Sequence, residues 1–319
     1  MRIALVTPAR PGARSGNRHT ALRWAAMLRA AGHVVMVAQQ WQLDARTDLM
    51  LALHARRSHA SMRAFHAAHP GRPLLLTLTG TDVYRDIRHS PEARASLAMA
   101  HGFIVLQPEA LRELPRRLRA KASVVVQSSA TRLRHAPPKR QFRFCVIGHL
   151  REEKDPLRAF AALALLPREL PLEVVQLGES LEARLARQAR AAMHSEPRYR
   201  WLGGLPHARA LRWLASSHAM VISSRMEGGA NVVSEAIRIG VPVLASRIPG
   251  NIGLLGADYP AYFAVGNERA LSRLMKRAVD DRGFYELLQR RVARLRPTVA
   301  PESEARMLLE AIARVIRRR

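Results

Sequence analysis

The feature that most constrains the fold is a regular alternation of short apolar runs with segments of helical periodicity. Six runs in the first half of the chain and six in the second have the length and composition of buried strands. Strands that alternate with helices in this way form parallel sheets with helices packed on their faces. The predicted strands are residues 2–7, 33–38, 48–54, 73–79, 102–107, 122–127, 142–148, 172–178, 199–203, 219–224, 241–246 and 261–265.

A polar, proline-broken segment at residues 131–141 separates the two sets of strands, as an interdomain linker does. We therefore predict an α/β protein with two Rossmann-like, doubly wound domains, residues 1–134 and 135–300, that face a central cleft. Residues 301–319 predict a C-terminal helix, and a return of this helix to the first domain is one way for it to pack.

A helix is also predicted between the first two strands. Residues 18–31 place Leu22, Ala25, Ala26 and Leu28 on one apolar stripe. We expect this stripe to face the core of the first domain.

The formal net charge of +27 would suit a nucleic-acid or anionic membrane partner. Only four of the 52 basic residues are lysines, however, and arginine is abundant together with alanine, as in proteins from GC-rich genomes. Aromatic residues make up only 5% of the chain, too few for platforms that stack on single strands. We predict neither a nucleic-acid partner nor membrane association.

The sequence also bears on the cellular location of the protein. No apolar run approaches the length that crosses a bilayer, and the apolar stretch at residues 3–7 is too short for a signal peptide. The single cysteine, Cys145, falls in a predicted strand, where we expect it to be buried, and it has no partner for an internal disulfide. We therefore expect a cytoplasmic protein.

Ligands of doubly wound sheets bind just beyond the carboxyl ends of the strands. The loop after the first strand lacks both the G-x-G-x-x-G spacing and a P-loop lysine, so a dinucleotide site is not predicted. It opens a helix, and Arg10, Arg14 and Arg18 add positive charge there, which together predict an anion site. An ordinary loop of an arginine-rich protein is the alternative.

The turn after the fourth strand reads Thr79-Gly80-Thr81-Asp82. Its hydroxyls and carboxylate could contact sugar hydroxyls or a nucleophile, so Thr81 is a candidate for acceptor binding and Asp82 for catalysis. The alternative is that Asp82 only caps a helix or a turn.

The turn after the first strand of the second half, residues 148–156, contains Lys154, one of the chain's four lysines. Because nearly all other basic residues of the chain are arginines, lysine at this position indicates that the lysine side chain itself is required. Cationic donors ahead of a helix that starts near Pro156 suit a diphosphate.

A second turn, residues 223–236, joins a strand to a helix that begins near Asn231. Its glycines leave backbone amides accessible to an anion at the helix N-terminus. Glu235, one turn into the helix, suits a ribose diol. The alternatives are an exposed loop carboxylate for Glu227 and a carboxylate that complements the helix dipole for Glu235.

These residues resemble a known family. Glu227 and Glu235 form an E-x7-E motif, and residues 148–154 are similar to a G-R-L-x-x-E-K-G element. Both are signatures of GT4-type glycosyltransferases of the GT-B fold. The resemblance implies donor-site roles: Lys154 and the amides of Asn231, Val232 and Val233 bind the diphosphate, Glu235 binds the ribose, Glu227 lies at the donor sugar, and Gly16 closes over the phosphates.

Two departures from the family pattern matter. The family arginine is replaced by His149, and Arg151 is the candidate that could take over its phosphate contact. The family histidine after the fourth strand is missing, and the Thr79-Gly80-Thr81-Asp82 turn stands in its place.

A narrower resemblance rests on several strings: residues 15–20 with Arg23-Trp24, residues 79–87, GHLREEKDP and EGGANVVSEA. They are similar to the selenosugar synthases of selenoneine biosynthesis. This implies a UDP-sugar donor, with N-acetylglucosamine as the sugar, and selenophosphate as the acceptor. UDP and phosphate leave, and a 1-selenosugar is the product.

This resemblance assigns acceptor binding to cationic and polar residues, because selenophosphate is small, multiply anionic and already nucleophilic. The candidates are Arg10, Arg14, Asn17, Arg18, Thr81 and His149.

Catalysis is assigned to Glu227, Lys154 and Asp82. We expect no metal ion, since Lys154, Arg151 and the helix end at Asn231 can carry the charge of the leaving UDP.

The histidines at 54, 59, 66 and 69 fall on a predicted helix, where we expect them to be solvated.

Three rival functions remain open at this point. One is a GT4-type enzyme acting on a lipid or envelope polysaccharide at the membrane surface. Another is a nucleotide-sugar epimerase or phosphorylase. The third is a non-catalytic two-lobed binding protein.

Overall fold

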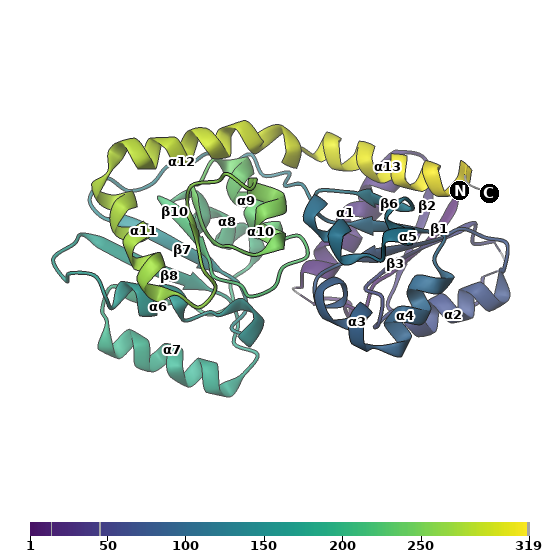
Figure 1. Ribbon diagram of the computed structural model, residues 1–319, viewed down its shortest axis with the longest axis horizontal. Helices are drawn as coiled ribbons and strands as arrows, with labels where there is room; N and C mark the ends of the chain where they lie inside the picture. Colours follow the sequence, from purple (N-terminus) through teal and green to yellow (C-terminus); the bar gives the residue numbers. More distant parts are fainter. Residues whose placement is uncertain (14, 45, 318–319) are drawn as a thin grey trace. The chain divides into compact units, whose positions relative to one another are not determined.

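The computed structural model describes residues 1–13, 15–44 and 46–317, which form two compact units (Figure 1). Each unit is built on one six-stranded sheet in which all strand pairs are parallel. All twelve predicted strands and the predicted α/β class are confirmed. Unit 1 comprises Met1–Gln127, Glu227–Asn231 and Pro301–Arg319; unit 2 comprises Ser128–Met226 and Val232–Ala300.

The sheet of unit 1 has the strand order β2-β1-β3-β4-β5-β6. Its central strands are continuous runs of buried apolar residues, as expected of strands covered on both faces. The strands are β1 (Arg2–Val6), β2 (Val34–Ala38), β3 (Leu49–Leu53), β4 (Leu74–Leu78), β5 (Gly102–Val105) and β6 (Ala122–Val124).

Helices and helical turns connect these strands, and α13 joins them from the end of the chain. They are α1 (Gly16–Ala30), α2 (His59–Ala68), the π-helical turn η1 (Asp82–Asp86), α3 (Ile87–His89), α4 (Pro91–Met99), the 3-10 helix η2 (Pro108–Glu113), α5 (Arg116–Arg119) and α13 (Pro301–Arg317).

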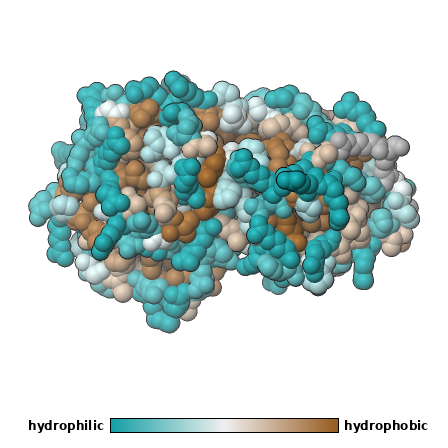
Figure 2. All heavy atoms as spheres, viewed as in Figure 1, coloured by the Kyte–Doolittle hydropathy of each residue, from teal (hydrophilic) through white to brown (hydrophobic). Residues whose placement is uncertain are grey.

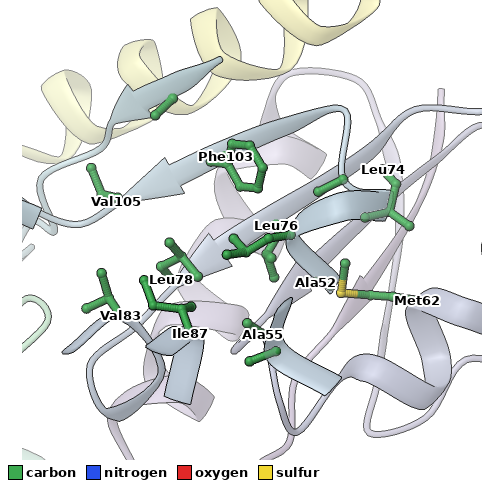
Figure 3. Packing of buried hydrophobic residues seen from close by; sticks show 14 of the residues in the cluster. Ala52, Ala55, Met62, Leu74, Leu76, Leu78, Val83, Ile87, Phe103 and Val105 are labelled. Carbon is green, nitrogen blue, oxygen red and sulfur yellow. The ribbon is translucent and has the colours of Figure 1, made fainter. Parts of the chain in front are cut away.

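Alternate residues of each strand in unit 1 point to opposite faces and build two separate cores. On one face, Leu75 of β4 packs with α1 and with Leu308 of α13. On the other face, Leu76 packs with α2 and α4, and Figure 3 shows this layer with Met62 of α2 and Phe103 of β5.

One prediction about α1 is wrong. The buried face of this helix consists of Thr20, Ala21, Trp24, Ala25 and Leu28, whereas Leu22 and Ala26 are exposed. The side chain of Trp24, the largest on the helix, decides which face is buried. The alanines lie on both sides of this face, so the sequence alone did not define the apolar stripe.

The sheet of unit 2 has the order β12-β11-β10-β7-β8-β9. Cys145 lies in β7, fully buried as predicted, and burial raises the pKa of its thiol to about 12. The strands are β7 (Phe142–Ile147), β8 (Leu172–Leu177), β9 (Tyr199–Trp201), β10 (Ala219–Ile222), β11 (Val243–Ser246) and β12 (Tyr262–Phe263).

The helices of this half of the chain alternate with the strands, apart from the two long helices α11 and α12, which follow one another. They are η3 (Glu152–Lys154), α6 (Arg158–Leu163), α7 (Ala183–Ser195), α8 (His207–Ala215), α9 (Asn231–Ile239), α10 (Pro249–Leu255), α11 (Glu268–Asp280), α12 (Arg282–Leu295) and η4 (Arg296–Val299).

Many charged residues lie on helix surfaces, although a few carboxylates, among them those of Asp82 and Glu304, are buried. Figure 2 shows hydrophilic residues along α7, the helix that carries Arg184, Arg187 and Arg190. No helix in the described part of the chain is both long and apolar enough to cross a membrane.

Each sheet has a point at which the chain reverses the direction in which strands are added. In unit 1 it lies between β1 and β3, and in unit 2 between β7 and β10. Loops that leave two neighbouring strands in opposite directions open a crevice at such a point. The turns after β1 and β3 and after β7 and β10 are therefore the places where functional residues are expected.

Candidate functional site

The turns after β7 and β10 are tied together in unit 2. The hydroxyl of Ser223 donates to the carbonyl oxygens of Lys154 and Asp155, at 3.1 and 2.9 Å. The backbone N–H of Arg225 donates to the carbonyl oxygen of Glu153 at 2.8 Å. Asp155 has a left-handed backbone (φ 44°), which ends η3 sharply. These bonds fix the position of Lys154 at the switch point of the sheet.

A small hollow opens at this place, lined by Gly148, Lys154, Gln176, Ser223 and Ser224 among others. The Lys154 side chain lies over Gly148, with its Cδ 3.9 Å from the position that a Cβ would take there. Gln176 is fully buried, and its Nε2 has no hydrogen-bond partner among the described residues. A buried N–H without a partner is costly, so this hollow provides a donor for a bound group.

Arg151 precedes η3 in the same turn. Its Nε is buried and likewise has no partner within the described part of the chain. His149 is half-buried two positions earlier, just before Leu150, which bridges to Ser180. The structure thus brings together three of the predicted residues, His149, Arg151 and Lys154, in one turn.

The helix predicted near Pro156 begins only at Arg158 and has six residues. A helix this short has a weak dipole, so side-chain donors must supply most of any attraction for an anion. The guanidinium of Arg158 is itself paired with Asp155 at 2.9 Å and with Glu268.

Helix α9 begins at Asn231, as predicted, and its next residues are Val232 and Val233. Glu235 accepts a partner that the sequence did not suggest: Nε2 of His207 lies 2.7 Å from its Oε1. The two residues are 28 positions apart and belong to different helices, so no local pattern could pair them.

The glycine-rich segment Glu227–Asn231 belongs to unit 1. A Cβ on Gly228 would lie 1.2 Å from the carbonyl oxygen of Thr79, so only glycine allows this approach. The side chain of Glu227 is only 7% exposed, and the alternative of an exposed loop carboxylate is therefore wrong.

Helix α1 begins at Gly16, two residues earlier than predicted, with Ser15 as its N-cap. Gly16, Asn17 and Arg18 therefore share its first turn, and Nε of Arg18 is buried with no partner in the residues described. Arg10 is exposed in the preceding loop, and Arg14 lies outside the described residues.

Asp82 is completely buried, and its carboxylate faces the backbone. Oδ1 accepts from the N–H of Thr79 at 2.9 Å, from the Thr79 hydroxyl at 3.1 Å and from the N–H of Gly80 at 2.8 Å. Oδ2 accepts from the N–H of Ala55 at 3.0 Å. This geometry favours a positioning role, in which Asp82 joins the turns after β3 and β4, over direct contact with a substrate.

The prediction for His54 is wrong. It does not lie on a helix, because α2 begins only at His59, and it is buried rather than solvated. The backbone of His54 is left-handed (φ 76°), a strained conformation for a residue with a Cβ, and the side chain lies at the carboxyl end of β3. An apolar strand run followed by a histidine was the only available signal.

His54 orients Thr81. The N–H of Arg57 lies 3.4 Å from Nδ1 of His54, which leaves the proton on Nε2 to donate to the Thr81 hydroxyl at 3.1 Å. Burial lowers the pKa of His54, against the raising effect of Asp82, so the imidazole is neutral near pH 7. The Thr81 hydroxyl hydrogen is then available to another acceptor.

Across residues 1–13, 15–44 and 46–317, no group of three or more His, Cys, Asp and Glu side chains is arranged to hold a metal ion.

Comparisons with known proteins agree with this architecture. The sequence matches the profile of the family described as glycosyl transferases group 1 over residues 127–295. The fold is similar to that of sucrose-phosphate synthase from Thermosynechococcus elongatus, with a TM-score of 0.78, 15% identity and full coverage of both chains.

Two further structures share this fold. The Anabaena protein HepE, solved in complex with UDP and glucose, has a TM-score of 0.78 and 15% identity over 98% of this chain and 99% of that one. The lipopolysaccharide outer core galactosyltransferase WaaB has a TM-score of 0.71 and 13% identity over 98% and 99% of the two chains. Both sheets of this chain thus form the GT-B fold.

Proposed function

Because the chain belongs to the glycosyl transferases group 1 family, we propose that it moves a sugar from a UDP-sugar to selenophosphate and releases UDP and phosphate. The observation that carries the donor half of this proposal is the cationic turn at the switch point of unit 2. There the Lys154 side chain, the buried Nε of Arg151 and the buried Nε2 of Gln176 lie in a turn and hollow held by Ser223.

These groups suit a diphosphate. They are a point charge, a guanidinium and an amide, all donors, and they stand where charge develops when UDP leaves. HepE, which shares the fold, was solved with UDP and glucose, which supports uridine as the nucleotide. We propose that Glu235 binds the ribose, and that His207 orients the Glu235 carboxylate.

The sugar half of the proposal involves Glu227 and N-acetylglucosamine as the transferred group. Glu227 is buried and directly precedes Gly228, which lies against the Thr79–Gly80 turn of unit 1. Such a carboxylate can accept hydrogen bonds from sugar hydroxyls or stabilise positive charge at the anomeric carbon.

Selenophosphate is the proposed acceptor. Its selenium attacks the anomeric carbon while the bond from that carbon to UDP breaks, and the electron pair leaves with UDP. Water then attacks the phosphorus, the Se–P bond breaks, and phosphate and the 1-selenosugar remain. The donors proposed for the anionic acceptor are Arg10, Asn17, Arg18, Thr81 and His149, of which Thr81 is oriented by His54.

The proposal includes no metal ion, since the cationic turn can carry the charge of the leaving diphosphate. Treatment with EDTA is expected to leave the rate of UDP release unchanged. A rate restored only by added Mg²⁺ or Mn²⁺ would remove this part of the proposal.

The test is a mass-spectrometric screen of UDP-N-acetylglucosamine and other UDP-sugars with selenophosphate, thiophosphate or no acceptor. We expect a 1-selenosugar and stoichiometric UDP only when selenophosphate is present. Conversion of the UDP-sugar without any acceptor would indicate an epimerase instead. Transfer to a lipid or polysaccharide acceptor, with none to selenophosphate, would retain the donor site and replace the acceptor.

A further inference from the structure

The C-terminal helix carries a carboxylate that is completely buried in unit 1. Glu304 of α13 is 0% exposed. Its Oε1 accepts from Nε1 of Trp24 at 2.6 Å, and its Oε2 accepts from Nε of Arg23 at 2.8 Å. A buried carboxylate is tolerated only when charge and hydrogen bonds compensate it. Both partners come from α1, so this pair joins the end of the chain to the first helix.

Arg23 extends the connection to the glycine-rich segment. Its second nitrogen, Nη2, donates to Oδ1 of Asn231 at 3.1 Å. A guanidinium has donors only, so the amide oxygen of Asn231 must face it. The Asn231 amide nitrogen therefore points the other way, and Nδ2 lies 3.6 Å from the position that a Cβ on Gly16 would take.

The place to which this amide nitrogen points is also fixed. The hydroxyl of Thr20 donates to the carbonyl oxygen of Gly16 at 2.9 Å, and the buried Gln127 donates to the hydroxyl of Thr20. Gly16 has no side chain to cover the amide of Asn231. An oriented N–H₂ group thus lies beside the first turn of α1.

We propose that Arg23 and Glu304 are positioning residues for the donor site. They hold the side-chain amide of Asn231 as a hydrogen-bond donor toward the phosphates of the UDP-sugar. This inference rests on the proposed function. Because Glu304 neutralises the Arg23 guanidinium, Arg23 acts as a spacer that orients Asn231, and α13 takes part in the reaction without touching the substrate.

The test is a double-mutant cycle between Arg23 and Asn231. Arg23→Lys keeps the positive charge but cannot reach Glu304 and Asn231 with separate nitrogens. We expect it to lower kcat/KM for the UDP-sugar about tenfold, the effect of one lost charge-assisted hydrogen bond. In the Asn231→Ala background the same change should have little further effect, because the group that it positions is gone.

Controls separate positioning from folding. Arg306→Lys on the exposed face of the same C-terminal helix should leave kcat/KM unchanged. Glu304→Gln is the second variant of the network, and it should give a smaller loss that is again absent without Asn231. Thermal unfolding of each variant reports any general loss of stability. An equal loss of kcat/KM from Arg23→Lys with and without Asn231 would overturn the proposal, as would no loss in either background.

A readout that needs no substrate distinguishes this inference from the proposed function. The side-chain amide protons of Asn231, assigned by their absence in Asn231→Ala, should give a resonance in the wild type that shifts in Arg23→Lys, because the guanidinium of Arg23 donates to the oxygen of this amide. If these protons behave as expected but UDP does not bind the wild type, the Arg23–Asn231 contact stands and the donor-site role fails together with the proposed function. If UDP binds and Arg23→Lys changes neither this resonance nor kcat/KM, only the inference fails.

Discussion

Unit 1 and unit 2 have the same layers, but they treat polar groups at the carboxyl ends of their strands differently. Unit 1 turns carboxylates inward: Asp82 binds the backbone of two turns, and Glu304 is paired with α1. Within the described residues, each unit also leaves buried donors without a partner at its switch point: Nε of Arg18 in unit 1, and Nε of Arg151 and Nε2 of Gln176 in unit 2. The two units therefore share donors that suit an anion, and they differ in the buried carboxylates, which in unit 1 hold loops and helices in place.

The largest expected effect tests the inward carboxylate of unit 1. Asp82→Ala should lower the free energy of unfolding by about 3 kcal/mol, because it leaves one buried and two partly buried N–H groups without this acceptor. Urea unfolding measures this, with Asp280→Ala on the exposed side of α11 as the control. Lost turnover at wild-type stability would instead make Asp82 the catalytic residue that the sequence predicted.

The next effect tests the donors of unit 2. Lys154→Ala and Glu235→Ala should each remove about 1.5–3 kcal/mol of binding, an affinity for UDP lower by about 10- to 150-fold in calorimetry. Unchanged UDP affinity in both alanine variants would mean that the donor site lies elsewhere.

Glu227→Gln should impair turnover more than UDP binding.

A somewhat smaller effect is expected where glycine permits close backbone contact in unit 1. Gly228→Ala brings a Cβ onto the carbonyl oxygen of Thr79, which should cost about 1–3 kcal/mol or displace Glu227. Turnover measured together with thermal unfolding separates these two outcomes. Gly71→Ala is the matched control, since nothing lies within 4 Å of the added methyl group. Wild-type behaviour of Gly228→Ala would show that the segment is not held against this turn.

The smallest effect concerns pH and unit 2. Burial, with help from His135 and Arg143, lowers the pKa of His218 to about 4, and its Nδ1 accepts from the N–H of Arg143 at 3.0 Å. Below pH 6.5, the ordinary pKa, this histidine is protonated in the unfolded chain but stays neutral in the folded protein. The free energy of unfolding therefore falls as the pH drops from 6.5 toward 4. The partial exposure of His218 limits the loss to less than about 1 kcal/mol.

His218→Asn retains an acceptor and does not titrate. Urea midpoints measured between pH 7 and pH 4.5 should therefore fall less in this variant than in the wild type. His194→Asn, on the exposed face of α7, is the control and should follow the wild type. Parallel curves for all three proteins would contradict the assignment.

Sequence reasoning found the strands and the turns that follow them, because buried parallel strands leave long apolar runs that need no partner to be recognised. It also predicted the start of α9 from the glycines before it, and it singled out Lys154 because lysine is rare in this chain. It misjudged the face of α1, where small residues left the stripe ambiguous. It predicted a solvated helical position for His54, which is buried beside Thr81 and Asp82, 27 or more positions away in the sequence.

The sequence by itself therefore determined the α/β layers and the positions of the chemical groups along the chain, because hydrophobic periodicity and turn composition are local properties. Only the tertiary structure decided which polar groups are paired. One such pair is His207 with Glu235. Another is Glu304 with Arg23, which in turn binds Asn231. These contacts join different helices that are well separated in the sequence. Tertiary packing determines such pairs, because it brings side chains that are distant in the sequence within hydrogen-bond distance. These pairs follow no periodicity that the sequence alone would show.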